Sequence, residues 1–231
     1  AATADFESPG DRAVLGGGIG LMVTLAALFI PNWTVRPLLI GWTSLIPGRS
    51  PAWFAARANA RHRSAFSLTT IVPFAIAVAM TGVFYTVANA GRAAGGMNGG
   101  VNGFLTIMVP IFFIAGAGGI ANIAMVGRTR RQEGALLGVI GARSGTILGS
   151  TILEGAIYAI TGILFGLAVT LLSATSAALM SGGGMEVFIG SIPVTTLLPA
   201  IGASLVLAIT TTWLPAQLDR RPMMENLRQP V

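Results

Sequence analysis

The residues best suited to specific chemistry lie in one short basic segment between two long apolar runs. Residues 128–154 read RTRRQEGALLGVIGARSGTILGSTILE, with closely spaced arginines, Glu133 and, further on, Glu154. Such charges suit ion pairing with another protein. A basic, amphipathic segment between two membrane spans therefore predicts a site that a cytoplasmic partner binds or pushes. The alternative is an ordinary positively charged loop that only sets the topology.

Several other kinds of chemistry are excluded by residue types that the sequence lacks. The chain has no cysteine, which excludes disulfides, thiolate metal sites and cysteine nucleophiles. It has no lysine, so it cannot form a Walker A phosphate-binding loop. The single histidine, His62, cannot assemble a metal site and is expected at the surface. We therefore expect no metal on this chain, and any ATP must be hydrolysed by another chain.

Glu154 is the one carboxylate that the sequence places at membrane depth. A charged acid inside a bilayer is costly, and such residues usually face a partner or water. A proton relay would need further acids or histidines along a path, and the spans supply none. We expect Glu154 to hydrogen-bond a neighbouring helix or to pair with an arginine such as Arg143.

The composition predicts an all-α, polytopic membrane protein. Only 10% of the residues are charged and 53% are apolar, whereas a soluble domain carries about 25% charged residues. A helix needs about 20 apolar residues to cross the hydrocarbon, and inside lipid the backbone must satisfy its own hydrogen bonds. Five segments meet this length and are predicted as transmembrane helices: 13–31, 66–89, 103–127, 148–175 and 194–217.

The arginines predict the orientation of these helices. Twelve of the fourteen fall on one side of a five-span arrangement, within residues 32–65, 128–147 and the C-terminal tail. Only Arg12 and Arg92 fall on the other side, together with half of the acids, namely Asp5, Glu7, Asp11 and Glu186. The positive-inside rule therefore predicts an N-terminus outside and a C-terminus in the cytoplasm. We expect membrane lipid, and no nucleic acid, among the partners.

The ends and loops of the chain give two further expectations. The chain begins AATADFESPG, with no initiator methionine and no secretory pattern, so we expect earlier spans in the same gene product. The alternative is a short tail that is translocated unaided. The loops 90–102 and 176–193 are glycine-rich, and we expect flexible outer connections that cannot bury a core.

Residues 49–66 read RSPAWFAARANARHRSAF and form one apolar and one basic face at helical spacing. We expect this segment to lie along the inner lipid surface with its arginines near anionic head groups. The alternative is a basic flank that only sets topology.

Gly162 and Gly166 have the G-x-x-x-G spacing that lets helix backbones approach closely. This spacing predicts helix packing, either within the chain or between two copies.

The order of residues in the basic segment resembles a known family. The pattern R-x-R-R-Q-E-x-A-L-L-x-x-I-G-A, followed by apolar sequence with a glutamate, resembles the FtsX-like permease family of ABC transporters, which includes MacB-type exporters. ARANARHRSAF is similar to the family's arginine-rich entry to its first core helix. The proline–alanine pair before RRPMMENLR is similar to its ending, and RPLLIGW to the segment that links two halves of duplicated members. The resemblance is most specific over 128–154.

The resemblance implies a domain organisation and a coupling site. Residues 1–48 would be an outer tail and a linker transmembrane helix. Residues 49–231 would be the permease domain, with four transmembrane helices, a coupling helix over about 128–147 and a cytoplasmic tail over 218–231. Arg131 with Glu133 matches the family's Arg-x-Glu pair. The implied ATPase-coupling residues are Arg128, Arg130, Arg131, Gln132, Glu133, Ala135, Leu136, Leu137, Ile140, Gly141 and Ala142.

The resemblance also implies a function, in the bacterial cytoplasmic membrane. A cytoplasmic ABC ATPase homodimer would hold the ATP and magnesium, and its hydrolysis would move this permease and a second permease half or copy. The permease itself would not be an enzyme or carry a cofactor. Such mechanotransmission would drive export of an amphipathic substrate. The alternatives are a permease that signals to an outer cell-wall hydrolase and, with only Glu154 in support, an ATP-independent secondary carrier. Many members have a large outer domain where this chain has only 90–102, which weakens the case for direct capture of a bulky partner.

Overall fold

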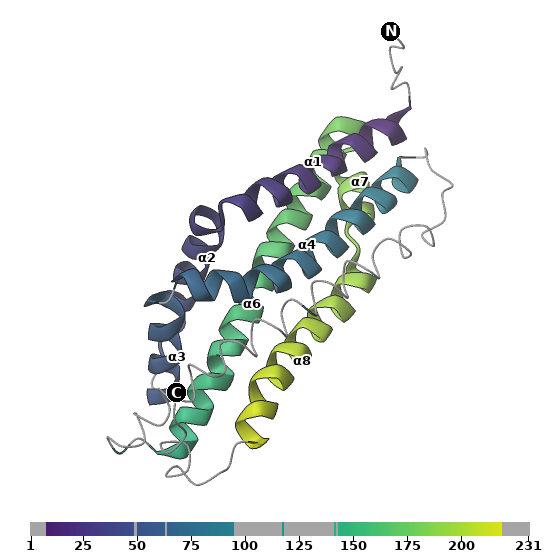
Figure 1. Cartoon of the computed structure of the whole chain (residues 1–231). Helices are drawn as coiled ribbons and strands as arrows, with labels where there is room; N and C mark the ends of the chain where they lie inside the picture. The colour runs from purple at the N-terminus through teal and green to yellow at the C-terminus, as the bar shows by residue number, and fades with distance from the viewer. Residues whose placement is uncertain are drawn as a thin grey trace.

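The computed structural model describes residues 8–48, 50–62, 64–94 and 143–218, together with Ala117 and Gly141, and this part of the chain is helical with no strand (Figure 1). The predicted all-α class is therefore confirmed. The helices are α1 (Pro9–Phe29), α2 (Pro31–Leu45), α3 (Pro51–His62), α4 (Ser64–Ala93), α6 (Ser144–Ser181), α7 (Gly184–Ser191) and α8 (Val194–Leu218).

Three stretches of the described residues are long and apolar enough to cross a membrane. They are Thr70–Ala93 in α4, Gly145–Ser181 in α6, and Gly184–Thr210, which runs through α7 into α8. They coincide with the second, fourth and fifth predicted spans. Helix α1 covers most of the first predicted span, and the span predicted over 103–127 lies outside the described residues apart from Ala117.

Helix α6 is the centre of the bundle and contacts α1, α2, α3, α4, α7 and α8. It runs parallel to α4, since Gly162 lies against Phe74 and Gly166 against Val78. It runs antiparallel to α1, where Gly16 and Gly20 lie against Ser176 and Ser173. Figure 1 shows α1 and α8 flanking the long α6.

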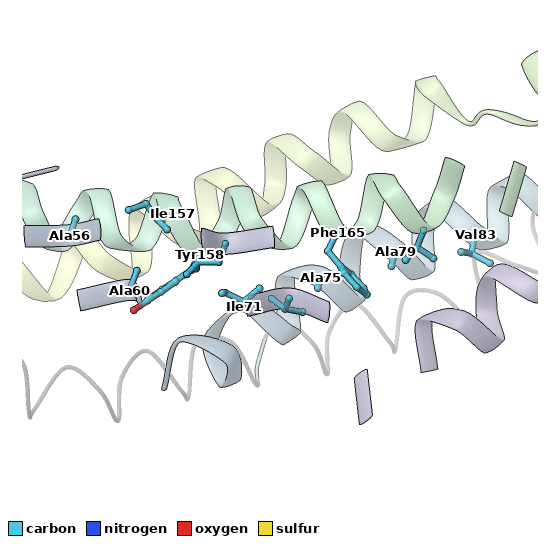
Figure 2. Close-up of a cluster of buried hydrophobic side chains, with 12 residues drawn as sticks. Ala56, Ala60, Ile71, Ala75, Ala79, Val83, Ile157, Tyr158 and Phe165 are labelled. Atoms are coloured by element: carbon cyan, nitrogen blue, oxygen red, sulfur yellow. The ribbon is translucent and has the colours of Figure 1, made fainter. Parts of the chain in front are cut away.

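The main core cluster lies where α2, α3 and α4 meet α6 (Figure 2). Alanines line much of it, so the backbones of neighbouring helices can approach closely. Its buried members are Val35, Leu39, Ala56, Ala60, Ile71, Ala75, Ala79, Val83, Ile157, Tyr158, Phe165 and Val169.

Helix α6 is longer than the predicted span 148–175. Its 38 residues rise about 57 Å, well beyond the hydrocarbon thickness of about 30 Å, so α6 must tilt or extend past the hydrocarbon. It ends at Gly182, whose φ of 70° is the left-handed conformation that favours glycine at helix ends.

Two helices lie in segments for which no helix was predicted. Helix α2 occupies part of 32–65, where spacing of Val35, Leu39 and Trp42 produces one apolar face towards α6. Helix α7 and the end of α6 occupy most of 176–193, and α7 buries Val187 and Ser191. The prediction of a flexible loop over 176–193 was therefore wrong, because an eight-residue helix is too short to show a clear period in sequence. Of the loop predicted over 90–102, the first four residues belong to α4 and Ala94 to a turn.

Candidate functional site

The start of α6 joins the predicted coupling segment to the bundle. Gly141 lies in a turn with a φ of 92°, and Arg143 is the extended residue before the first turn of α6. Apart from Gly141, the coupling residues 128–142 lie outside the described residues. The coupling helix was expected to reach residue 147, but residues 144–147 belong to α6, and Gly145 sits in its first turn rather than at a break. Glycine is tolerated there because first-turn amides have no partner within the helix.

Helix α3 packs along the first turns of α6. Gly149 of α6 lies against Ala52, where an added Cβ would sit 3.4 Å from the Ala52 Cβ. Further along, Ala56 and Ala60 are fully buried in the cluster that contains Ile157 and Tyr158 (Figure 2). The segment 49–66 was expected to lie along the inner lipid surface, and in the structure Ala56 and Ala60 of this segment pack in the core with α6, because small side chains allow the two helices to pack closely.

Hydrogen bonds from side chains connect helix α2 to both α3 and α6. Trp42 Nε1 donates to Thr161 Oγ1 of α6 at 2.9 Å. From α3, Arg61 donates to the Ile40 carbonyl at 2.8 Å and to Thr43 Oγ1 at 2.9 and 3.1 Å. The Trp42 and Trp53 rings meet edge-on at 6.4 Å. Desolvation by burial, and then the neighbouring Arg57, lower the pKa of Arg61.

Glu154 lies on α6 with only 4% of its surface exposed. It accepts a hydrogen bond from the hydroxyl of Tyr158, one turn further along the same helix. The expected pairing with Arg143 is ruled out by geometry, because eleven residues of helix separate the two by about 16 Å, beyond the reach of both side chains. The bond to Tyr158 gives the buried carboxyl group a partner within its own helix.

We expect Glu154→Gln to leave stability and transport nearly unchanged, because the amide oxygen can still accept the Tyr158 bond. Glu154→Ala should lower the free energy of unfolding by about 1–3 kcal/mol, since it leaves a buried hydroxyl without this acceptor. Thermal unfolding in detergent and transport by reconstituted protein would measure the two effects. A Glu154→Gln variant that folds normally but loses transport would show that the carboxylate itself is used, as a proton relay requires.

Two close-packed helix contacts, here called the α4–α6 seam and the α1–α6 seam, hold α6 in the bundle. Against α4, an added Cβ on Gly162 would lie 2.9 Å from the Ala75 backbone nitrogen, and one on Gly166 would lie 2.9 Å from that of Ala79. Against α1, Ser173 Oγ donates to the Gly17 carbonyl at 2.8 Å, and Ser176 Oγ donates to the Gly16 carbonyl at 2.6 Å. The packing of Gly162 and Gly166 is thus within the chain.

The arrangement suits the transmission of movement. The described residues contain no group of three or more His, Cys, Asp or Glu side chains that could hold a metal ion, and His62 is exposed at the end of α3. A displacement at the start of α6 would instead reach α3 and α2 through their contacts, and α4 and α1 through the seams. Sequence reasoning missed Trp42, Thr161 and Arg61, because hydrogen bonds between distant helices leave no local pattern.

Comparison with known proteins adds one finding. A protein-family model, described as FtsX-like permease C-terminal, matches residues 105–221, slightly more than half of the chain. The matched range contains all of α6, α7 and α8. No curated protein and no solved structure matches the chain significantly.

Proposed function

This chain belongs to the FtsX-like permease family, and from that premise we propose that it is the membrane-spanning permease of an ABC transporter, MacB-type in its subtype. A separate cytoplasmic ATPase homodimer hydrolyses ATP and holds the magnesium. The permease carries no catalytic residue of its own. It couples hydrolysis to export of an amphipathic substrate by mechanotransmission, together with a second permease half or copy.

One observation supports this proposal most strongly. The helix that follows the proposed coupling segment is α6. This helix also contacts every other described helix. Any force applied to residues 128–142 therefore enters the bundle at its central element.

The distribution of charge along the bundle supports the proposed orientation. At the end where α3 and α6 begin, the described arginines are Arg57, Arg61 and Arg143, and the described acid is the buried Glu154. The opposite end has a mixed set, namely Asp11, Arg12, Arg92 and Glu186. By the positive-inside rule, the end with the greater number of arginines faces the cytoplasm, and the N-terminus of α1 faces outward.

Co-purification tests the proposal directly. We expect the full chain, expressed in a bacterial host and extracted in mild detergent, to bring down an ATPase with Walker motifs. Replacement of residues 128–142 by a glycine–serine stretch of equal length should abolish this recovery. Mass spectrometry identifies the partner, and because the ATPase is cytoplasmic, the result also places the start of α6 on that side of the membrane.

A different result would favour another class of function. If the chain purifies alone and transports in vesicles without any ATPase, it is a secondary carrier. If the ATPase binds equally well to the variant with the replaced segment, residues 128–142 are not the docking site.

A further inference from the structure

The pair of helices α2 and α3, here called the α2–α3 hairpin (residues 31–62), has an outer surface that the bundle does not cover. Its inner surface is occupied, since Val35 and Leu39 from α2 and Ala56 and Ala60 from α3 are buried against the core. Its outer surface carries large apolar side chains, with Leu45 81%, Phe54 74% and Trp33 80% exposed. Side chains of this size are poorly suited to water, so this surface needs a covering layer.

Hydrogen bonds hold the two helices of the hairpin to each other and to α6. The Arg61 hydrogen bonds to α2 and the Trp42 bond to Thr161 tie its two helices to each other and to α6. Of its exposed side chains, Phe54 lies on α3, the helix that packs along the first turns of α6. This position is the end of the bundle at which two apolar spans, in α4 and α6, begin.

The charged residues of the hairpin are all arginines. The sequence contains no acid between Asp11 and Glu133. Arg57 makes no hydrogen bond or ion pair with any described residue, and Arg36 is exposed with only Asn32 of its own helix as a partner, at 3.4 Å. Arg57 also lies one turn before Arg61, and it lowers the pKa of Arg61 by like-charge repulsion. An anion between these guanidinium groups would relieve that repulsion.

We propose that the α2–α3 hairpin binds the head groups of anionic phospholipids in the adjacent leaflet. The exposed Trp33, Leu45 and Phe54 enter the boundary between head groups and acyl chains, and Arg57 contacts the phosphate. Aromatic and arginine side chains side by side are typical of membrane interfaces. The inference needs only that the apolar helices span a membrane, and it does not depend on an ATPase.

A single label at position 54 tests the proposal, and the absence of native cysteine makes it site-specific. Full-length Phe54→Cys protein, labelled with an environment-sensitive fluorophore in detergent, is titrated with dioleoylphosphatidylglycerol or dioleoylphosphatidylcholine. We expect a blue shift that half-saturates at a lower concentration of phosphatidylglycerol. Arg57→Gln should raise that concentration about fivefold, the equivalent of about 1 kcal/mol for one basic residue at an anionic surface.

Two matched variants control this experiment. Arg57→Lys keeps the charge and should restore the preference for phosphatidylglycerol. Arg92→Gln removes an exposed arginine at the opposite end of the bundle and should leave the label unaffected.

Three results would overturn the proposal. The first is an equal response to both lipids, and the second is an equal loss in the Arg57→Gln and Arg92→Gln variants. The third is a label that stays in water with either lipid and is buried only when the co-purified ATPase is added, because the hairpin would then be a protein-docking surface.

Discussion

Replacing Gly162 and Gly166 together by valine is expected to lower the thermal stability of the protein strongly. Both positions place the α6 backbone against the α4 backbone, where an added Cβ would lie 2.8 Å from the Phe74 Cβ at the first site and 2.6 Å from Val78 Cγ1 at the second. The nearby Ala75 and Ala79 backbone nitrogens cannot rotate away as a side chain could. The two helices must therefore separate.

The expected cost is about 1–3 kcal/mol for each site, because overpacking a filled interface forces the backbone to shift. The two sites lie on one seam, so their effects need not add. The fraction of protein that stays monodisperse after heating in detergent would measure the loss.

Gly202→Val is the matched control for this change. Gly202 lies in the apolar helix α8, and an added Cβ there meets nothing within 4 Å. Gly202→Val makes the same change in intrinsic helix propensity without the clash. If the double variant at 162 and 166 is no less stable than the Gly202→Val variant, the seam between α4 and α6 is not a close contact.

The parts of the fold that sequence could predict are those that the bilayer imposes. Apolar runs of about 20 residues must be helical in lipid, which is why the spans at α4, α6 and α8 were located within a few residues. The small residues at Gly162 and Gly166 were also informative, because only glycine allows backbones to approach so closely.

The arrangement of α2 and α3 could not be predicted for a different reason. Their arginines indicate a surface, and Ala56 and Ala60 are too weakly apolar to indicate a buried face. Which side of α3 is buried depends on Gly149 and Tyr158 of α6, almost 100 residues away in the chain. Similarly, the Glu154 bond to Tyr158 has a spacing of four residues that is visible in sequence, but the burial of the pair is not.

Replacing Arg131 and Glu133 together by alanine is expected to leave membrane insertion intact and to uncouple ATP hydrolysis from transport. Both residues lie outside the described residues, and their proposed role rests on the family pattern and on the position of α6 directly after them. Loss of a hydrogen-bonded charge pair at a protein interface costs about 2–5 kcal/mol, so we expect ATPase affinity to fall at least about tenfold. ATP hydrolysis and substrate transport in proteoliposomes would measure the uncoupling.

Arg143→Ala is the matched control, because Arg143 is an exposed arginine at the same end of the bundle, immediately before α6. If both variants lose activity equally, the positive charge of this end matters rather than the particular pair. If the double variant keeps full ATP-driven activity, residues 128–142 serve only as a topology signal. If only the Arg131 and Glu133 double variant is uncoupled, force enters the permease at this segment. It would then pass first to α3, because the first turns of α6 contact α3 before α6 reaches its contact with α4.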